Sequence, residues 1–235
     1  MKGIILAGGS GTRLYPLTKV TNKHLLPIGS FPMIHYPITS LTNAGITDIM
    51  VITGTEHMGD MITLLGSGQE YDCEFTFRVQ DQPDGIAGAL RLCENFVSDD
   101  NCTVILGDNI FSRDLTQDVS EFNEDIKLFF IEVNDPHRFG VGVFDKDNLI
   151  KVEEKPTHPK SNLACIGIYM YSNKVFDAIK AIKKSRRGEY EITAVNNYLL
   201  KNNSEPSHVV LQDSWVDAGT MQSYHNTSRM IYENE

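Results

Sequence analysis

The sequence predicts an α/β fold of the Rossmann-like type, with a mostly parallel central sheet flanked by helices and an added smaller sheet. Three observations predict this class. Strand-like apolar segments alternate with helical segments through the first half of the 235-residue chain. A glycine-rich loop follows the first apolar run, and strand-like segments become closely spaced after about Ile126. Strands that alternate with helices in this way form parallel sheets with right-handed crossovers.

The first half of the chain predicts four strands and three intervening helices. The expected strands are Lys2–Ala7, Asp48–Thr53, Glu74–Gln80 and Thr103–Leu106. The expected helices are Met33–Ala44, Met58–Leu65 and Ile86–Phe96. Proline suits the first turn of a helix and glycine suits the position after its end, so we expect Pro32 to start the first helix and Gly45 to stop it.

The second half predicts more strands than helices. The expected strands are Ile126–Val133, Val141–Phe144, Leu149–Glu154 and Ala164–Tyr171, with a further strand near Ser207–Leu211. Helices are expected at Lys174–Lys183, at Ile192–Asn202 and from about Met221. We expect these strands to extend the sheet and to form a second lip over a ligand site, with Gly140 at a turn that a ligand can approach. Because no long linker or repeat interrupts the chain, we expect a single domain over residues 1–235.

Composition limits the possible partners. Hydrophobic residues make up 41% of the chain, which supports a substantial core. No apolar run approaches 18 residues and the chain does not open on a signal segment, so we expect a cytoplasmic protein without a membrane span. The net charge of −10 argues against a nucleic-acid partner, which would require a basic face.

The four cysteines predict reduced core thiols. Cys73, Cys93, Cys102 and Cys165 form no CxxC pair and lie in segments with apolar patterning. We therefore expect neither disulfides nor metal ligands from them.

The glycine-rich loop predicts a phosphate-binding site. In Leu6-Ala7-Gly8-Gly9-Ser10-Gly11-Thr12-Arg13, the glycines allow backbone N–H groups to approach an anion, and Arg13 adds a guanidinium. Lys23 supplies a second cation soon afterwards. The loop lacks the Gly-Lys-Ser/Thr ending of a P-loop and the third glycine of a dinucleotide fingerprint. Two cations beside a glycine loop favour a triphosphate over a hydride cofactor.

Polar side chains at other strand ends extend this site. Ligands of parallel sheets gather beyond the carboxyl ends of the strands, where Asp108 follows Leu106-Gly107. Asp217 is a second carboxylate late in the chain, and two such oxygen ligands suit Mg²⁺ together with substrate phosphates. Lys155 ends another strand and provides a third cation. Gln80 offers one donor and one acceptor to a pyrimidine edge.

In its motifs, the chain resembles the sugar-1-phosphate nucleotidylyltransferases, and among them the thymidylyltransferases. The matching motifs occur in the family's order over nearly the whole chain. They are Leu-Ala-Gly-Gly-Ser-Gly-Thr-Arg-Leu at 6–14, Lys23 with Leu25-Leu26-Pro27, Gln80 with Pro83-Asp84-Gly85, Leu106-Gly107-Asp108-Asn109, Arg138-Phe139-Gly140, Glu153-Glu154-Lys155-Pro156, Arg187-Gly188-Glu189 with Glu191-Ile192-Thr193, and Trp215 with Asp217-Ala218-Gly219-Thr220.

The resemblance implies a reaction and a set of site residues. It implies Mg²⁺-dependent transfer of a deoxythymidylyl group from dTTP to α-D-glucose 1-phosphate, giving dTDP-glucose and pyrophosphate for dTDP-rhamnose and cell wall polysaccharide synthesis. It places the catalytic roles on Arg13, Lys23, Asp108 and Lys155, and Mg²⁺ on Asp108 and Asp217. It assigns nucleotide binding to Leu6, Gly8, Gly9, Ser10, Gly11, Thr12, Arg13, Lys23, Gln80, Pro83, Gly85 and Asp108. It assigns sugar-phosphate binding to Asn109, Gly140, Glu154, Lys155, Ile166, Gly167, Arg187 and Trp215.

Several alternatives stay open at this point. Gln80-Asp81-Gln82-Pro83 differs from the family's usual Gln-Pro-Ser-Pro, so a UTP- or CTP-dependent transferase on a related sugar phosphate is the main alternative. A Rossmann dehydrogenase and a non-catalytic regulatory subunit of the same fold are the others. The resemblance also predicts a homo-oligomer, a dimer or a tetramer. Longer family members continue past residue 235, so we expect a short form without their C-terminal extension and its regulatory site.

Overall fold

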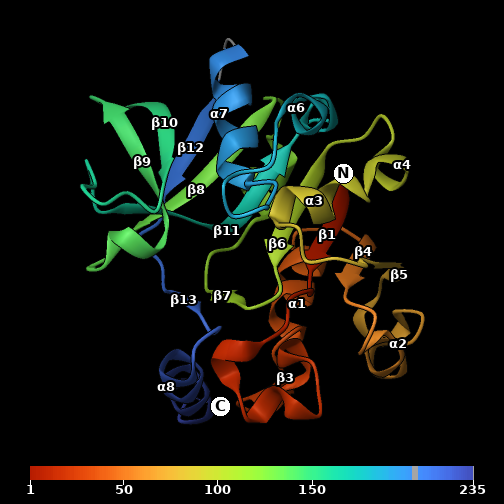
Figure 1. Cartoon of the computed structure of the whole chain (residues 1–235). Coiled ribbons are helices and arrows are strands. Elements are labelled where there is room, and N and C mark those ends of the chain that lie inside the picture. The colour runs from red at the N-terminus through yellow and green to blue at the C-terminus, as the bar shows by residue number, and fades with distance from the viewer. Residues whose placement is uncertain (203–205, 235) are drawn as a thin grey trace. The chain divides into compact units, whose positions relative to one another are not determined.

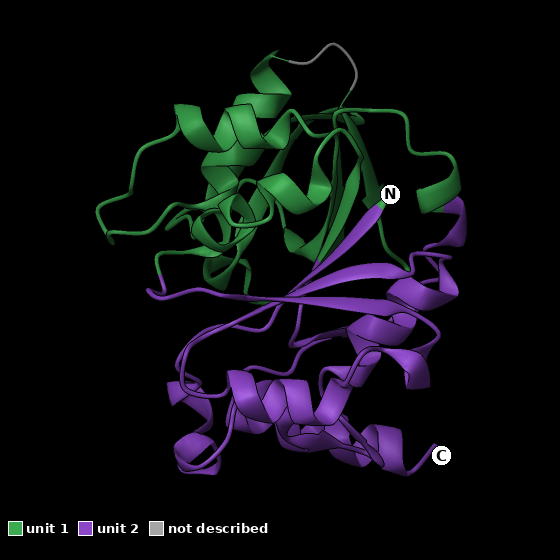
Figure 2. Cartoon of the chain, turned by 90° about the vertical axis from the view of Figure 1, so that its right-hand side faces the viewer, with its two compact units in different colours: residues 1, 84–104, 118–213 green, residues 2–83, 105–117, 214–235 purple. Residues whose placement is uncertain are grey.

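The computed structural model describes residues 1–202 and 206–234 (Figure 1). Cα proximity divides the chain into two compact units, coloured separately in Figure 2. Unit 1 comprises Met1, Asp84–Val104 and Asp118–Asp213, and unit 2 comprises Lys2–Pro83, Ile105–Gln117 and Ser214–Glu235. Neither unit is a continuous stretch of sequence. The single domain expected from the sequence stays a prediction.

Unit 2 contains three parallel strands in the order β1, β4, β5. β1 (Lys2–Leu6) and β4 (Asp48–Thr53) are apolar and almost wholly buried, as expected of central strands. β5 (Glu74–Val79) alternates exposed and half-buried residues and is an edge strand of the sheet. Helices α1 (His35–Asn43) and α2 (Met58–Leu65) connect these strands. The carboxyl ends of β1 and β4 therefore lie at one edge of the sheet.

Two small sheets and one helix complete the regular structure of unit 2. β2 (Pro27–Ile28) pairs with β3 (Phe31–Pro32), and β7 (Asn109–Phe111) pairs with β13 (Trp215–Asp217). Helix α8 (Met221–Tyr232) begins at a capping box formed by Thr220 and Ser223. The remaining short elements are 3₁₀ helices at Thr12–Leu14, Leu17–Lys19, Lys23–Leu25 and Gln69–Tyr71.

Unit 1 contains a sheet in which β12, β8, β11, β9 and β10 are neighbours. All of these pairs are antiparallel except β8 with β12. The strands are β8 (Ile126–Glu132), β9 (Gly140–Asp145), β10 (Asn148–Glu154), β11 (Leu163–Tyr171) and β12 (Ser207–Val210). The helices are α3 (Ile86–Arg91), α4 (Glu94–Val97), α6 (Val175–Ala181), α7 (Ile192–Asn202) and the 3₁₀ turn Pro136–Arg138.

Two further elements contribute residues to both units. Strand β6 (Cys102–Leu106) gives its first three residues to unit 1 and its last two to unit 2. The short helix α5 (Thr116–Ser120) is divided after Gln117.

The predicted α/β class is confirmed, and most predicted elements match to within one or two residues. The role predicted for Pro32 is wrong, because the first helix begins at His35 and Pro32 lies in strand β3 instead of a first helical turn. The N–H groups of Met33 and Ile34 donate to the carbonyls of Leu26 and His24, which holds this segment out of the helix. Gly45 follows α1 with φ of 79°, as a helix stop should.

The other corrections concern element boundaries. The helix expected at Ile86–Phe96 is two short helices, α3 and α4, and the helix expected at Lys174–Lys183 ends at Ala181. No helix among the described residues is long and apolar enough to cross a membrane. The four cysteines are free thiols, and Cys165 alone is half-buried.

Candidate active site

The loop after β1 has the backbone expected of a phosphate-binding turn. Gly9 and Gly11 adopt φ of 98° and 61°, values that only glycine reaches without strain. The Thr18 hydroxyl donates to the Gly11 carbonyl at 2.8 Å and closes the loop on the following turn. Arg13 follows in a short 3₁₀ helix that begins at Thr12.

Asn22 fixes the turn that carries Lys23. Its side-chain amide donates to the Ala7 carbonyl at 3.2 Å and to the Thr53 hydroxyl at 3.3 Å, at the ends of β1 and β4. Its Oδ1 accepts from the backbone N–H of His24 at 2.9 Å and from the ring nitrogen Nδ1 at 2.7 Å. Asn22 is buried and was not predicted as a site residue. It ties Lys23 to two strand ends.

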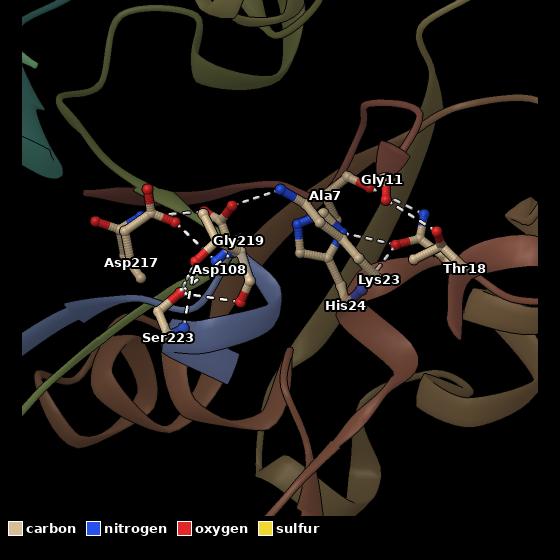
Figure 3. A network of polar contacts seen from close by, with 12 residues as sticks. Ala7, Gly11, Thr18, Lys23, His24, Asp108, Asp217, Gly219 and Ser223 are labelled. Carbon is tan, nitrogen blue, oxygen red and sulfur yellow. Dashed lines mark hydrogen bonds and ion pairs between the residues drawn. The ribbon is translucent and has the colours of Figure 1, made fainter. Parts of the chain in front are cut away.

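Lys23 lies against Asp108 in the interior of unit 2 (Figure 3). The ammonium Nζ donates to Asp108 Oδ2, and both side chains are almost fully buried. Burial opposes the charge on Asp108, but the Lys23 ammonium and hydrogen bonds from Lys23 and Asn109 outweigh it. The pKa of Asp108 is therefore well below its usual range.

Asp217, Asp108 and Arg13 converge on Gly219. A Cβ at Gly219 would lie 2.7 Å from Asp217 Oδ1, 2.9 Å from Asp108 Oδ2 and 3.0 Å from Arg13 Nη2. Burial, and then the nearby Asp108 carboxylate, raise the pKa of Asp217. Two carboxylates and a guanidinium from three distant segments thus share one small space, which is left open because residue 219 has no side chain.

The β7–β13 pair adds an indole to this cluster. Trp215 Nε1 donates to Asn109 Oδ1 at 2.7 Å, and Asn109 Nδ2 donates to Asp108 Oδ1 at 3.1 Å. In the register of the pair, Asp217 lies opposite Asn109. The predicted sugar-phosphate residue Asn109 is therefore bonded directly to Asp108, and Trp215 is linked to Asp108 through Asn109.

A cavity of about 210 Å³ lies beside the glycine loop. Four predicted nucleotide residues line it, namely Gly9, Ser10, Gln80 and Pro83. Gln80 Oε1 approaches Gly8 so closely that a Cβ at Gly8 would lie 3.2 Å from it. The structure therefore brings Gln80, at the end of β5, to the loop at the end of β1.

Part of the lining of this cavity was not predicted from the sequence. The loop after β4 contributes Gly54, Thr55, Glu56 and His57, and Asp81 follows Gln80. The signal that would have found this loop is its position directly after the predicted strand Asp48–Thr53, since ligands gather at strand ends. Its side chains were overlooked because none belongs to a phosphate-binding motif.

The remaining predicted residues lie in unit 1, where Glu154 is the centre of a polar group. Glu154 ends β10 and lies opposite Gly140 of β9 in the register. Its Oε2 accepts from the Thr193 hydroxyl at 2.5 Å, and its Oε1 accepts from Arg187 Nη2 at 3.2 Å. Lys155 Nζ is 3.7 Å from Glu154 Oε1.

Lys155 and Gly85 have unusual backbone conformations. Lys155 has φ of 43°, and its N–H donates to the Phe139 carbonyl at 2.9 Å. Gly85 has φ of 100° and lies against Tyr190, since a Cβ there would be 2.6 Å from the Tyr190 carbonyl oxygen. Ile166 and Gly167 lie in the stretch of β11 where its register with β8 shifts. Irregular backbone of this kind is common at functional sites.

Comparisons with known proteins identify the family of this chain. The family model described as nucleotidyl transferase matches residues 2–234. The chain belongs to the nucleotidyl transferase family. A glucose-1-phosphate thymidylyltransferase of Neisseria meningitidis is 40% identical over 237 residues, 98% of this chain and 82% of that protein. One of Mycobacterium tuberculosis is 42% identical over 228 residues, 95% of this chain and 79% of that protein.

A solved structure is also similar to this nucleotidyl transferase. It is a provisionally named glucose-1-phosphate thymidylyltransferase of Bacillus anthracis in complex with a sucrose. It has a TM-score of 0.94 and 52% sequence identity, and the match covers 99% of this chain and 96% of that one. The chain is therefore an enzyme of a known family, and the predicted resemblance is confirmed.

Proposed function

We propose that this enzyme transfers a deoxythymidylyl group from dTTP to α-D-glucose 1-phosphate and releases pyrophosphate. The observation that carries the proposal is the name shared by relatives about 40% identical over 98% of the chain. The cluster of Arg13, Lys23, Asp108 and Asp217 supports it, because phosphoryl transfer requires positioning and charge neutralisation more than a covalent nucleophile.

The two cations of unit 2 would act on the triphosphate. Arg13 would neutralise the triphosphate and the departing pyrophosphate by bidentate hydrogen bonds. Lys23 would bring an ammonium, already held by Asp108, to the reacting phosphate. The loop from Leu6 to Thr12 would bind phosphates and deoxyribose, while Gln80, Pro83 and Gly85 would bind the base.

Asp108 and Asp217 are suited to hold Mg²⁺. Their oxygens converge on the space beside Gly219, and the Asp108 carboxylate helps to raise the pKa of Asp217, which a bound cation would counteract. Mg²⁺, when bound, would supply positive charge against the α-phosphate. Without a cation, each carboxylate about 5 Å from a phosphate charge costs on the order of 3 kcal/mol at an effective dielectric of 20.

The resemblance implies which residues would bind the sugar phosphate. Lys155 and Arg187 would hold its phosphate, Glu154 would accept hydrogen bonds from its hydroxyls, Asn109 would donate to or accept from them, and Trp215 would pack against it. Gly140, Ile166 and Gly167 would line the same site. The phosphate oxygen attacks the α-phosphorus in line and needs no general base, because it carries no proton near pH 7.

The localisation, oligomeric state, domain organisation and pathway that we propose rest on the sequence and on the same family resemblance. We propose a cytoplasmic homo-oligomer of single-domain subunits that serves dTDP-rhamnose and cell wall polysaccharide synthesis. No nucleic acid or membrane partner is proposed.

Pyrophosphate release tests the proposal. We would assay dTTP, UTP, CTP, ATP and GTP, each with glucose 1-phosphate and Mg²⁺, and identify the product by mass spectrometry. The expected result is dTDP-glucose, with activity abolished by EDTA and restored by Mg²⁺. Preference for a purine nucleotide would overturn the pyrimidine assignment, and preference for UTP or CTP would establish the alternative transferase.

A further inference from the structure

The side chain of Arg187 lies among three glutamates of unit 1. Its Nη2 is 2.8 Å from Glu191 Oε2, 3.2 Å from Glu154 Oε1 and 3.7 Å from Glu189 Oε2. A guanidinium that is to bind a phosphate must offer free N–H groups. Here at least two of the five N–H donors already point to carboxylates.

Glu191 is the dominant partner of this guanidinium. Arg187 Nε donates to Glu191 Oε1 at 3.1 Å and Nη2 donates to Glu191 Oε2 at 2.8 Å, so the pair is bidentate. The Glu191 side chain is 15% exposed, whereas that of Glu189 is 40% exposed and makes no hydrogen bond to Arg187 within 3.5 Å. Parallel N–H···O bonds of this kind fix the guanidinium plane as well as its charge.

The fixed guanidinium in turn restrains Glu154. Arg187 Nη2 reaches Oε1 of Glu154, and the Thr193 hydroxyl reaches Oε2. A carboxylate has about four lone-pair positions, two on each oxygen. One donor on each oxygen therefore leaves a position on each for a ligand, and the Glu154 side chain is 31% exposed. Two adjacent hydroxyls of a sugar match such a pair of acceptors.

We infer that Glu191 is a positioning residue that acts through Arg187 to orient the Glu154 carboxylate toward two adjacent hydroxyls of the sugar phosphate. The inference rests on the proposed function, because it takes a sugar phosphate as the ligand of Glu154. It assigns Arg187 a role inside the site, as the link between two carboxylates, besides any contact with phosphate.

A purely structural role for Glu191 is the competing explanation. Ser185 Oγ also donates to Glu191 Oε1, at 2.6 Å, and the same hydroxyl accepts from the backbone N–H of Arg187 at 3.2 Å. In that explanation, Glu191 holds the loop between Ser185 and Glu189 in place and has no effect on Glu154. Removing the Ser185 hydroxyl weakens that closure but leaves the Arg187–Glu191 pair intact.

The test compares Glu191→Gln with two matched controls, Glu189→Gln and Ser185→Ala. Glu189→Gln removes the same charge from a glutamate that is near Arg187 but not hydrogen-bonded to it. For Glu191→Gln we expect at least a tenfold rise in KM for glucose 1-phosphate and less than a twofold change in KM for dTTP. Both controls should stay within twofold of the native enzyme. Near-native melting temperatures would show that all three variants fold.

A second readout separates positioning from folding. The native enzyme should prefer glucose 1-phosphate to its 2-deoxy and 3-deoxy analogues, and Glu191→Gln should reduce that preference at least fivefold. Adding Glu191→Gln to Glu154→Gln should cause no further loss. An effect of Ser185→Ala equal to that of Glu191→Gln would overturn the inference. Equal effects of Glu191→Gln and Glu189→Gln would also overturn it.

Calorimetric titration with glucose 1-phosphate keeps this inference distinct from the proposed function. If the native protein forms no dTDP-glucose, the proposed function fails. The inference then still predicts that Glu191→Gln weakens glucose 1-phosphate binding tenfold relative to Glu189→Gln. Equal affinities in that titration would overturn it.

Discussion

At the scale of single residues, Gly219 shows how the absence of a side chain leaves room for three charged side chains to meet. The space that its Cβ would fill is bounded by two carboxylate oxygens and a guanidinium nitrogen. No positive φ is required at this position, so its importance is steric. A methyl group there would have to displace the ends of functional side chains instead of straining the backbone.

Gly219→Ala should weaken cation binding more than it affects folding. We expect the dissociation constant for Mn²⁺, measured by electron paramagnetic resonance, to rise about tenfold, equivalent to about 1.4 kcal/mol. The matched control is Gly59→Ala in helix α2, where a Cβ meets no atom within 4 Å. That control should bind Mn²⁺ normally and gain about 0.5–1 kcal/mol of stability. Native Mn²⁺ affinity in Gly219→Ala would show that the aspartates do not hold a cation there.

His24 makes the stability of unit 2 sensitive to acid. Burial, and then the Lys23 charge, lower the pKa of His24 to about 3. The unfolded chain, with an ordinary histidine pKa near 6.5, therefore binds more protons between pH 6.5 and 3. The contribution of His24 to stability is complete above pH 6.5 and is lost as the pH falls, by roughly 1.4 kcal/mol per pH unit.

Urea unfolding at pH 7, 6 and 5 checks this sign. The native protein should lose stability with falling pH, and between pH 7 and pH 5 His24→Asn should lose about 2 kcal/mol less than the native protein. The other histidines are the same in both proteins, so the difference between the two slopes isolates His24. Equal slopes for the two proteins would mean that His24 is protonated when folded.

At the scale of elements, the β7–β13 pair joins the predicted sugar residues to the predicted metal carboxylates. Trp215→Phe keeps an aromatic ring but removes the indole N–H bond to Asn109. We expect a loss of about 1 kcal/mol in the free energy of unfolding and a several-fold rise in KM for glucose 1-phosphate. Tyr232→Phe, at an aromatic residue that is 72% exposed, is the control and should change neither. An unchanged KM in Trp215→Phe would remove the indole from the sugar site.

Sequence patterns predicted the long elements and missed the short ones. Asp48–Thr53 and Met58–Leu65 were predicted with their observed bounds, because each carries a full apolar run or helical repeat. β7 and β13 have three residues each, too few to show a period, and they pair across more than 100 positions. The helix at Ile86 breaks after Arg91 without a glycine or proline to signal it.

For the candidate site, the sequence predicted the charged residues and missed residues that support them. The sequence named Arg13, Lys23, Asp108 and Asp217, and the structure brings them together in unit 2. Asn22 and Glu191 were not predicted as site residues, although Glu191 belongs to one of the matching motifs, because their contacts involve partner residues and neither is part of a phosphate-binding or metal-ligating pattern. Such supporting residues are visible only once the fold sets their neighbours.

At the scale of the whole molecule, the chain passes repeatedly between the two units. It does so after Pro83, Val104, Gln117 and Asp213, and strand β6 has residues in both. A unit built from separated segments cannot complete its packing while the segments between them are unfolded. We therefore expect a single cooperative transition in scanning calorimetry, with equal calorimetric and van't Hoff enthalpies of about 160 kcal/mol near 60 °C. Two resolved transitions would contradict this expectation and the single-domain prediction.

The position of Asp217 in the sequence has a consequence for the order in which the enzyme matures on the ribosome. Lys23 and Asp108 are synthesised early and can pair, but Asp217 and Gly219 come from the last segment of unit 2. A nascent chain that has not yet exposed this segment has one paired carboxylate and no second acceptor for a divalent ion. The proposed ability to bind the cation would thus arise late in translation, after the unit 1 residues proposed for the sugar phosphate have left the exit tunnel.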